Sequence, residues 1–235
     1  PDTGRVRASI AQHYDNIHYM DSQVARILNA LEEDHLDGST VVIWTTDHGD
    51  AFPRAKRAVY ESGTRVPLIM RFPSREYAGE ANGSLVSFVD LAPTILRLAG
   101  GEAPNFIQGR DMLAGAEREY IFSARDRMDA TFDRVRAVRD SRYRLIENFA
   151  PKLEYFRPLL FRDMFPIMQE LWRVSKEDST DASYSQYFTA PRPRYELYDL
   201  ESDPHEIENL AGDSRLAAVE QRLVAALNGW RQRVG

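Results

Sequence analysis

Two adjacent residues with metal-ligand chemistry, Asp47 and His48, stand directly after a short apolar run at residues 41–46. Aspartate offers a hard anionic oxygen and histidine a neutral ring nitrogen, while Gly49 allows the chain to turn sharply beside a bound ion. The same residues would also serve as an acidic turn in which Asp47 accepts hydrogen bonds from backbone amides. The motif alone therefore indicates a metal site but does not distinguish it from a capped turn.

A lysine follows in the same stretch. Three residues separate Lys56 from Tyr60, and a second apolar run begins shortly afterwards at Val66. Beside a metal ion, a lysine ammonium is a natural partner for a tetrahedral oxyanion, because it is a compact charge with three donors. The alternative is that Lys56 belongs with Arg54 and Arg57 to a solvated basic loop.

Buried strands would have to position these groups. The run at residues 41–46 is apolar and β-branched without polar alternation, which is typical of a strand buried on both faces of a parallel sheet, and residues 66–70 resemble it. Ligands gather at the carboxyl ends of such strands, where Asp47 would lie. Apolar residues at three- and four-residue steps predict a helix over residues 6–33, and a second helix begins at Asp90. This order of elements predicts an α/β fold.

The character of the chain changes after residue 104. Four short, partly alternating segments predict a small antiparallel sheet: residues 120–122, 135–138, 143–146 and 195–199. Residues 150–190 are rich in aromatic residues and proline with weak periodicity, which predicts a long insertion. Residues 216–234 predict a terminal amphipathic helix. We therefore expect two domains, residues 1–104 and residues 105–235.

Composition excludes several classes of protein. The net charge of −6 argues against non-specific nucleic-acid binding, which needs a basic face. The chain has no cysteine, which excludes a disulfide framework, a thiolate metal site and a cysteine nucleophile within these residues. No apolar run approaches the roughly 20 residues that a membrane span needs, so we expect none. Periplasmic, secreted and cytoplasmic locations all stay open.

A series of short motifs runs along the chain in order. They are Tyr19-Met20-Asp21, Val24-Ala25-Arg26-Ile27-Leu28, Thr46-Asp47-His48-Gly49, Lys56-x-x-x-Tyr60-Glu61, Arg65-Val66-Pro67-Leu68-Ile69, Val89-Asp90-Leu91-Ala92-Pro93-Thr94-Ile95-Leu96, Tyr195-Glu196-Leu197-Tyr198-Asp199 and Asp203-Pro204-His205-Glu206-x-x-Asn209-Leu210. In this order they resemble the sulfatase family of the alkaline-phosphatase superfamily. The resemblance implies that residues 1–104 are the C-terminal part of a catalytic domain. That domain would be a mostly parallel sheet covered by helices, in an alkaline-phosphatase-like sandwich.

The resemblance also implies roles for single residues. Asp47 and His48 would be the second pair of ligands to a divalent metal, usually calcium in this family, with manganese as the alternative. Many relatives have asparagine where His48 stands, whereas others, including phosphonate and phosphodiester hydrolases, have histidine. Lys56 would contact the sulfate oxygens as a catalytic residue. Tyr60, Glu61 and Arg65 would be scaffolding for the loop.

The family's nucleophile is absent from these residues. It is a formylglycine made from the first residue of Cys/Ser-x-Pro-x-Arg, and no such pattern occurs here. The first pair of metal-binding aspartates and the upstream catalytic histidine have no counterpart either. His13 and His18, in the opening helix, are expected to be packing or surface residues, and His205 and Asp21 to be structural. We therefore expect a fragment or processed chain whose partner is the missing N-terminal segment of the same protein.

The resemblance implies a metal-dependent hydrolase of sulfate esters or sulfamates, active only with that segment. The tail at residues 199–206 and the aromatic insertion resemble sulfamidase-type relatives, which act on N-sulfated sugars, so a sulfated small molecule or glycan is the expected substrate. Two alternatives stay open. One is a phosphonate monoester or phosphodiester hydrolase, which His48 favours. The other is a non-catalytic fragment serving as a binding module, which the missing nucleophile favours.

Overall fold

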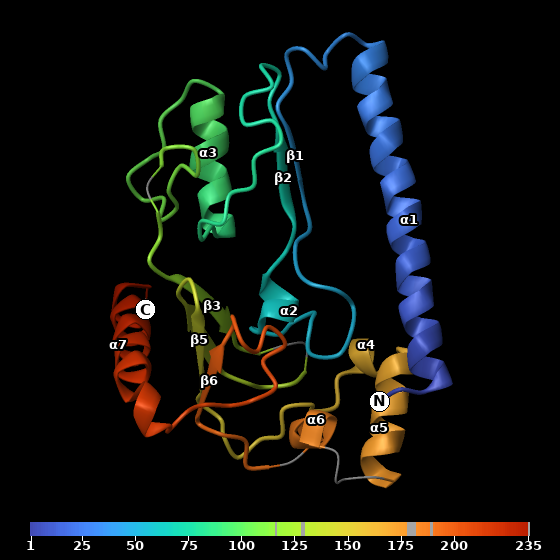
Figure 1. The fold of residues 1–235 in the computed structure, drawn as a ribbon, viewed down its shortest axis with the longest axis vertical. Helices are drawn as coiled ribbons and strands as arrows, with labels where there is room; N and C mark the ends of the chain where they lie inside the picture. The colour runs from blue at the N-terminus through green and yellow to red at the C-terminus, as the bar shows by residue number, and fades with distance from the viewer. Residues whose placement is uncertain (116, 128–129, 178–181, 189, 235) are drawn as a thin grey trace. The chain divides into compact units, whose positions relative to one another are not determined.

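The computed structural model describes residues 1–115, 117–127, 130–177, 182–188 and 190–234. The chain forms two compact units that interleave along the sequence (Figure 1). Unit 1 comprises Pro1–Glu80, Asp126–Asp133 and Ala150–Arg192, and unit 2 comprises Ala81–Arg125, Arg134–Phe149 and Pro193–Gly235. The predicted division near residue 104 stays a prediction.

Unit 1 opens with helix α1, Gly4–Glu33, which confirms the predicted helix. Its N-cap is Thr3, whose side-chain oxygen accepts a hydrogen bond from the Val6 N–H at 3.4 Å. The helix contacts helix α5, Pro166–Glu177, near its N-terminus (Figure 1). The apolar stripe that predicted the helix stays partly exposed: none of its residues is buried within this chain.

The two predicted strands of unit 1 are β1, Val42–Thr45, and β2, Leu68–Arg71. They pair antiparallel, with Val42 opposite Arg71 and Thr45 opposite Leu68. The sequence predicted that each of these strands belongs to a mostly parallel sheet and is buried on both faces. The pairing of β1 with β2 is antiparallel instead, and all four residues of β1 are partly exposed. The connection between them holds only helix α2, Glu61–Thr64, and folds back instead of crossing over the sheet, so β2 returns in the opposite direction.

The aromatic insertion of unit 1 has a core of its own. It contains helices α4, Leu160–Asp163, α5, and α6, Ala182–Ser185, followed by the 3-10 helix η2, Gln186–Phe188. Residues 178–181 and 189 of the predicted insertion lie outside the described residues. Five buried side chains form its cluster: Phe156, Met168, Leu171, Tyr184 and Tyr187. The aromatic residues thus form a local core, and α5 is an element that the weak periodicity did not predict.

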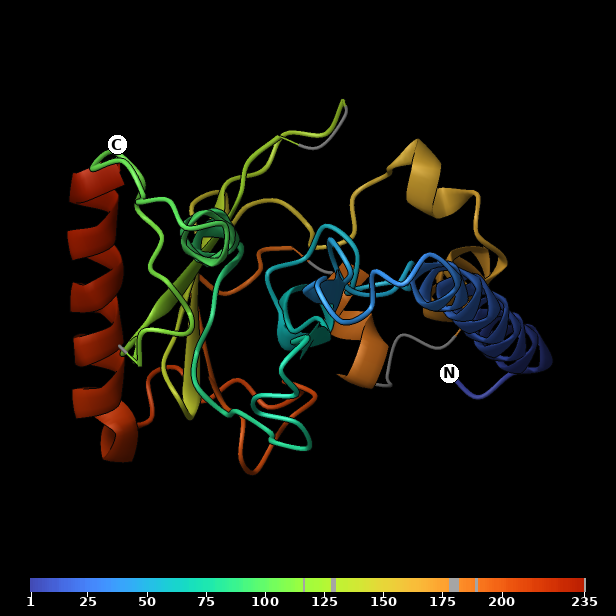
Figure 2. The same cartoon turned by 90° about the horizontal axis from the view of Figure 1, so that it is seen from above.

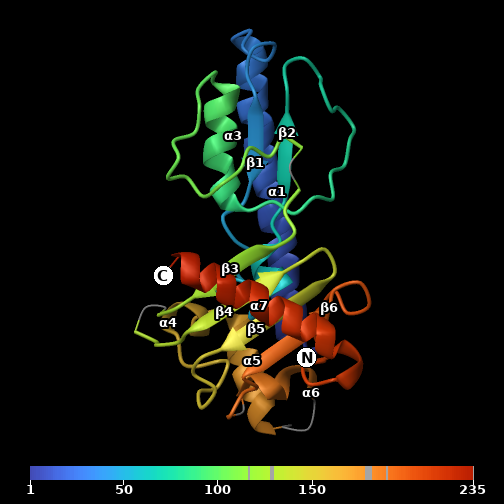
Figure 3. The same cartoon turned by 90° about the vertical axis from the view of Figure 1, so that its left-hand side faces the viewer.

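Unit 2 contains the predicted antiparallel sheet. Strands β3, Ile121–Arg125, β4, Val135–Arg139, β5, Tyr143–Asn148, and β6, Tyr195–Asp199, lie in the order β3-β4-β5-β6 with every pair antiparallel. Helix α7, Ala217–Val234, follows the 3-10 helix η3, Ser214–Leu216, and runs along one side of this sheet (Figures 2 and 3). Its buried Leu223 and Leu227 pack in one cluster with Val138, Leu145 and Leu197. This confirms the small antiparallel sheet with a terminal helix.

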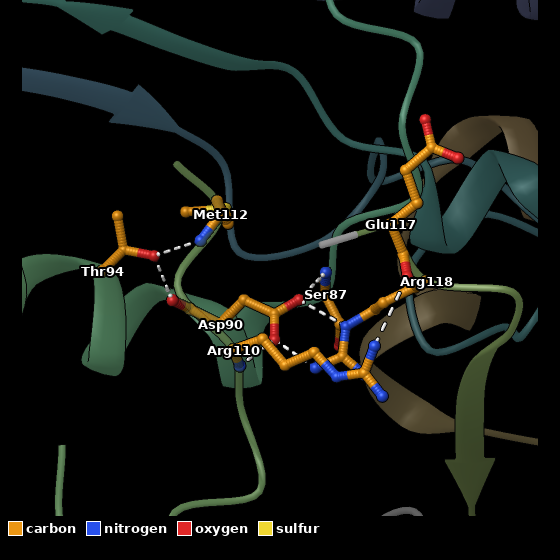
Figure 4. Close-up of polar contacts among 7 residues, drawn as sticks. All are labelled: Ser87, Asp90, Thr94, Arg110, Met112, Glu117 and Arg118. Atoms are coloured by element: carbon orange, nitrogen blue, oxygen red, sulfur yellow. Dashed lines mark hydrogen bonds and ion pairs between the residues drawn. The ribbon is translucent and has the colours of Figure 1, made fainter. Parts of the chain in front are cut away.

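Asp90 anchors a loop of unit 2 to helix α3, Leu91–Leu98, which follows the 3-10 helix η1, Phe88–Asp90 (Figure 4). The buried carboxylate accepts hydrogen bonds from the backbone N–H groups of Ser87 at 2.9 Å and Arg110 at 2.8 Å, and from Arg118 Nε at 2.8 Å. The Thr94 hydroxyl adds a link by accepting from the Met112 N–H at 2.9 Å. Asp90 occupies the predicted N-cap position, but its carboxylate binds this loop rather than an amide of α3.

Replacing Asp90 by Asn is expected to lower the free energy of unfolding at neutral pH by about 1–3 kcal/mol, because the partly buried guanidinium of Arg118 loses its carboxylate partner. Burial opposes ionisation of Asp90, but hydrogen bonds from Arg118, Arg110 and Ser87 outweigh it and hold its pKa below the ordinary value of 3.8. A lowered folded-state pKa stabilises the fold above that ordinary value, and the contribution is lost as the pH falls through the folded-state pKa.

Urea unfolding of wild type and Asp90→Asn should therefore differ clearly at neutral pH and less at about pH 3. Asp21→Asn is the control, since Asp21 is exposed on α1 and should leave the unfolding curve unchanged at both values. An equal difference between wild type and Asp90→Asn at both pH values would contradict the role of the carboxylate charge.

Candidate functional site

The candidate site lies on the loop between β1 and α2 in unit 1, and this loop is clamped onto α2. The Gly49 N–H donates to the Gly63 carbonyl at 3.0 Å. A Cβ at Gly49 would lie 1.8 Å from the Ser62 carbonyl oxygen, so only glycine permits this approach. The Ser62 hydroxyl in turn donates to the Arg54 carbonyl at 2.7 Å. The sequence predicted the sharp turn at Gly49, and the structure adds the reason for it.

Asp47 and His48 follow β1 directly and contact each other. His48 Nδ1 lies 2.6 Å from the Gly49 carbonyl oxygen. Because a carbonyl can only accept, Nδ1 must carry the proton of this hydrogen bond, which leaves the lone pair of the neutral ring on Nε2. His48 Nε2 lies 3.5 Å from Asp47 Oδ2, and the Asp47 side chain is 87% exposed. A nitrogen atom and an oxygen atom that could both bind a metal ion thus lie close together at the surface of the unit.

This geometry fits a divalent metal ion. Histidine ligands commonly donate their other ring N–H to a backbone carbonyl, as His48 does to Gly49. Two ligand atoms that each lie about 2.0–2.6 Å from one ion can be 3.5 Å apart, which is the distance between Asp47 Oδ2 and His48 Nε2. Across the part of the chain that the structure describes, no three His, Cys, Asp or Glu side chains gather into a metal-binding group. Among the described residues, Asp47 and His48 are thus a pair of candidate ligands rather than a larger group, and their ligand role stays a prediction.

Lys56 lies on the same loop and is held there by its backbone. Its N–H donates to the Asp50 carbonyl at 2.9 Å, which ties it to the turn that carries His48. Arg54 and Arg57 flank it with φ values of 66° and 68°, a left-handed conformation that bends the chain tightly on both sides of the lysine. The structure therefore brings Asp47, His48 and Lys56 onto one compact loop. The side chain of Lys56 points toward the ring of Phe161, with Nζ 4.7 Å from its centroid.

The expected scaffolding residues are in place beneath the loop. Tyr60 is 1% exposed and Glu61 is 7% exposed, and both belong to the turn that begins α2. The Tyr60 carbonyl accepts from the N–H groups of Gly63 at 2.9 Å and Thr64 at 3.0 Å. Arg54 lies over the Tyr60 ring, with Cζ 3.8 Å from the centroid. Arg65, by contrast, is exposed at the end of α2.

His13 of α1 reaches this loop, which the sequence did not reveal. Its Nε2 lies 3.2 Å from Asp50 Oδ1, and its ring centroid lies 4.8 Å from that of Phe52. The prediction that His13 is a packing residue is confirmed. Its packing partner is the loop that carries Asp47 and His48. No local pattern signals such a contact, because it joins a helix to a loop far along the chain.

Comparisons with known proteins agree with the motifs. Residues 1–101 match the family model for sulfatases. An ulvan-active sulfatase of Formosa agariphila is 38% identical over 238 residues, covering 100% of this chain and 40% of that protein. The human N-sulphoglucosamine sulphohydrolase is 29% identical over 251 residues, covering 98% of this chain and 49% of that protein. The chain thus spans less than half the length of these relatives.

Solved structures show the same fold. A putative sulfatase, yidJ, from Bacteroides fragilis superposes with a TM-score of 0.70 at 23% identity, covering 99% of this chain and 45% of that one. The phosphonate monoester hydrolase of Agrobacterium radiobacter superposes with a TM-score of 0.62 at 22% identity, covering 91% of this chain and 39% of that one. None of the helices in the described ranges is long and apolar enough to cross a bilayer. With its motifs, its fold and its relatives in agreement, this chain belongs to the sulfatase family.

Proposed function

We propose that the protein hydrolyses sulfate esters and that this chain contributes Asp47, His48 and Lys56 to its active site. The observation that carries the proposal is the clamped loop after β1, which presents an oxygen donor, a nitrogen donor and an ammonium group in one short segment. The 38% identity with an ulvan-active sulfatase over the whole chain supports it.

Each residue has a defined chemical task in this proposal. Lys56 donates hydrogen bonds to the sulfuryl oxygens, where negative charge increases in the transition state. Asp47 and His48 hold a divalent cation, calcium or manganese, which when bound supplies further electrostatic stabilisation of the same oxygens. The nucleophile, a formylglycine, is contributed from outside this chain, because the sequence here has neither a cysteine nor the Ser-x-Pro-x-Arg pattern.

The relatives support a substrate class for this proposal. Their names specify ulvan in one case and N-sulphoglucosamine in the other. We propose a sulfated glycan as the substrate class of this protein, because both relatives are named for sulfatase or sulphohydrolase activity on sugar-based substrates.

A second candidate is the hydrolysis of phosphonate monoesters or phosphodiesters. The observation that favours it is His48, whose ring nitrogen suits transition metals better than calcium. The fold does not decide between the two reactions, because the phosphonate monoester hydrolase of Agrobacterium radiobacter shares it.

Parallel assays separate the candidates. The protein that contains this chain together with its proposed nucleophile segment is supplied with an aryl sulfate and an aryl phosphonate that share one leaving group. We expect kcat/KM for the sulfate to exceed that for the phosphonate by at least about tenfold. The reverse order of sulfate and phosphonate would favour the second candidate, and hydrolysis of neither would contradict both.

A further inference from the structure

The Lys56 ammonium lies over an aromatic ring from a distant part of unit 1. Its Nζ is 4.7 Å from the centroid of Phe161, and the guanidinium carbon of Arg57 is 5.1 Å from the same centroid. Both distances are within the roughly 6 Å at which the face of a ring attracts a cation. We propose that Phe161 is a positioning residue, which holds the Lys56 ammonium in place for the sulfuryl oxygens. This inference rests on the proposed function.

The ring itself is held by its surroundings. Phe161 belongs to α4 and packs edge-to-face against Phe165, with centroids 5.3 Å apart and ring planes at 73°. The Asp163 carboxylate accepts from the Leu159 N–H at 2.8 Å and so fixes the start of α4. Leu160, the neighbour of Phe161 in α4, is 82% exposed, whereas Phe161 is 40% exposed beneath the two cations. Phe165 therefore packs against the Phe161 ring, and the two cations lie over that ring.

An aromatic ring can fix an ammonium without neutralising it. Among the residues that the structure describes, no carboxylate lies within ion-pair distance of Lys56 Nζ. A carboxylate partner would compensate the positive charge and occupy its N–H donors. A phenylalanine face attracts the cation through the ring quadrupole and accepts no conventional hydrogen bond, so the charge and the donors stay available to an anion. Restricting a long, flexible side chain in this way reduces the entropy that is lost when the substrate binds.

The contact with Phe161 can be measured apart from catalysis. The chain has three lysines, Lys56, Lys152 and Lys176, so reductive methylation with 13C-labelled formaldehyde gives few methyl signals. Lys56→Arg identifies the signal of Lys56. In wild type and in Phe161→Tyr, which keeps the ring, this signal should be shifted upfield by the ring current, whereas in Phe161→Leu it should lie with the other two lysines. Unaltered thermal unfolding of Phe161→Leu controls for the fold.

The kinetic arm uses the protein with its nucleophile segment and an aryl sulfate. Phe161→Leu should lower kcat by about 10- to 100-fold, because the Lys56 ammonium is no longer held in position for the sulfuryl oxygens. Phe161→Tyr should retain most of the activity. An unshifted Lys56 signal in wild type, or a wild-type kcat in Phe161→Leu, would overturn the proposal. If wild type hydrolyses no sulfate ester, the proposed function fails, and this inference, which rests on it, falls with it even if the methyl signals confirm the contact.

Discussion

Replacing Lys56 by alanine is expected to reduce kcat for an aryl sulfate by about 100- to 1,000-fold, which is the effect of removing one donor to a developing oxyanion. The fold should persist, because the Lys56 side chain lies over the exposed ring of Phe161 and the loop is held by backbone hydrogen bonds. Single-turnover kinetics at saturating substrate would measure the chemical step separately from binding.

Lys152→Ala is the matched control for Lys56→Ala, since Lys152 is exposed in the same unit and lies outside the loop. It should leave kcat unchanged. Lys56→Arg should retain part of the activity, because it keeps the charge but presents a planar fork in place of a compact ammonium. Turnover of Lys56→Ala close to that of wild type would remove Lys56 from the catalytic machinery.

Local patterns predicted most of the elements. The three- and four-residue apolar spacing predicted α1 to within two residues of its start, and the short alternating segments predicted β4 and β5, which are joined by a turn at Asp140. In that turn the Asp140 carboxylate accepts from the N–H groups of Arg142 at 2.8 Å and Tyr143 at 2.6 Å. These features depend on residues close in sequence, so the local sequence is enough to specify them.

Strand direction and the partners of side chains were harder to predict. An apolar β-branched run such as residues 42–45 indicates burial but carries no information on the direction of the neighbouring strand.

Helix α5 was missed because its buried residues, Ile167, Met168, Glu170 and Leu171, include a charged side chain that weakens the apolar pattern. The Glu170 carboxylate pairs with Arg173, at 2.8 Å and three residues further along the same helix.

For the candidate site, the sequence predicted the residue types but not their support. Asp47, His48 and Lys56 were predicted from their chemistry and from the resemblance that the motifs carry, and their roles stay a prediction. His13 and Phe161 were not, because each reaches the loop from another element through a contact that leaves no trace in spacing. A residue that is far from a site in the sequence can be assigned to that site only from the three-dimensional structure.

Manganese is expected to bind to this chain with a dissociation constant of about 0.1–1 mM, because Asp47 and His48 supply only two protein donors. Asp47→Asn and His48→Ala should each weaken that binding by at least about tenfold, since even the loss of an outer partner of a metal ligand costs 10- to 100-fold. Electron paramagnetic resonance of free Mn²⁺ measures this directly. Asp37→Asn is the control, because Asp37 is exposed in the turn before β1.

The choice between manganese and calcium can be tested at the ring nitrogen of His48. His48→Asn replaces a nitrogen donor by an amide oxygen, which calcium accepts as readily as any other oxygen ligand. The ratio of manganese to calcium affinity should therefore fall in His48→Asn relative to wild type, even where the affinity for calcium changes little. Equal ratios in the two proteins would mean that His48 does not contact the ion, and Asp47 alone would then be the ligand that this loop supplies.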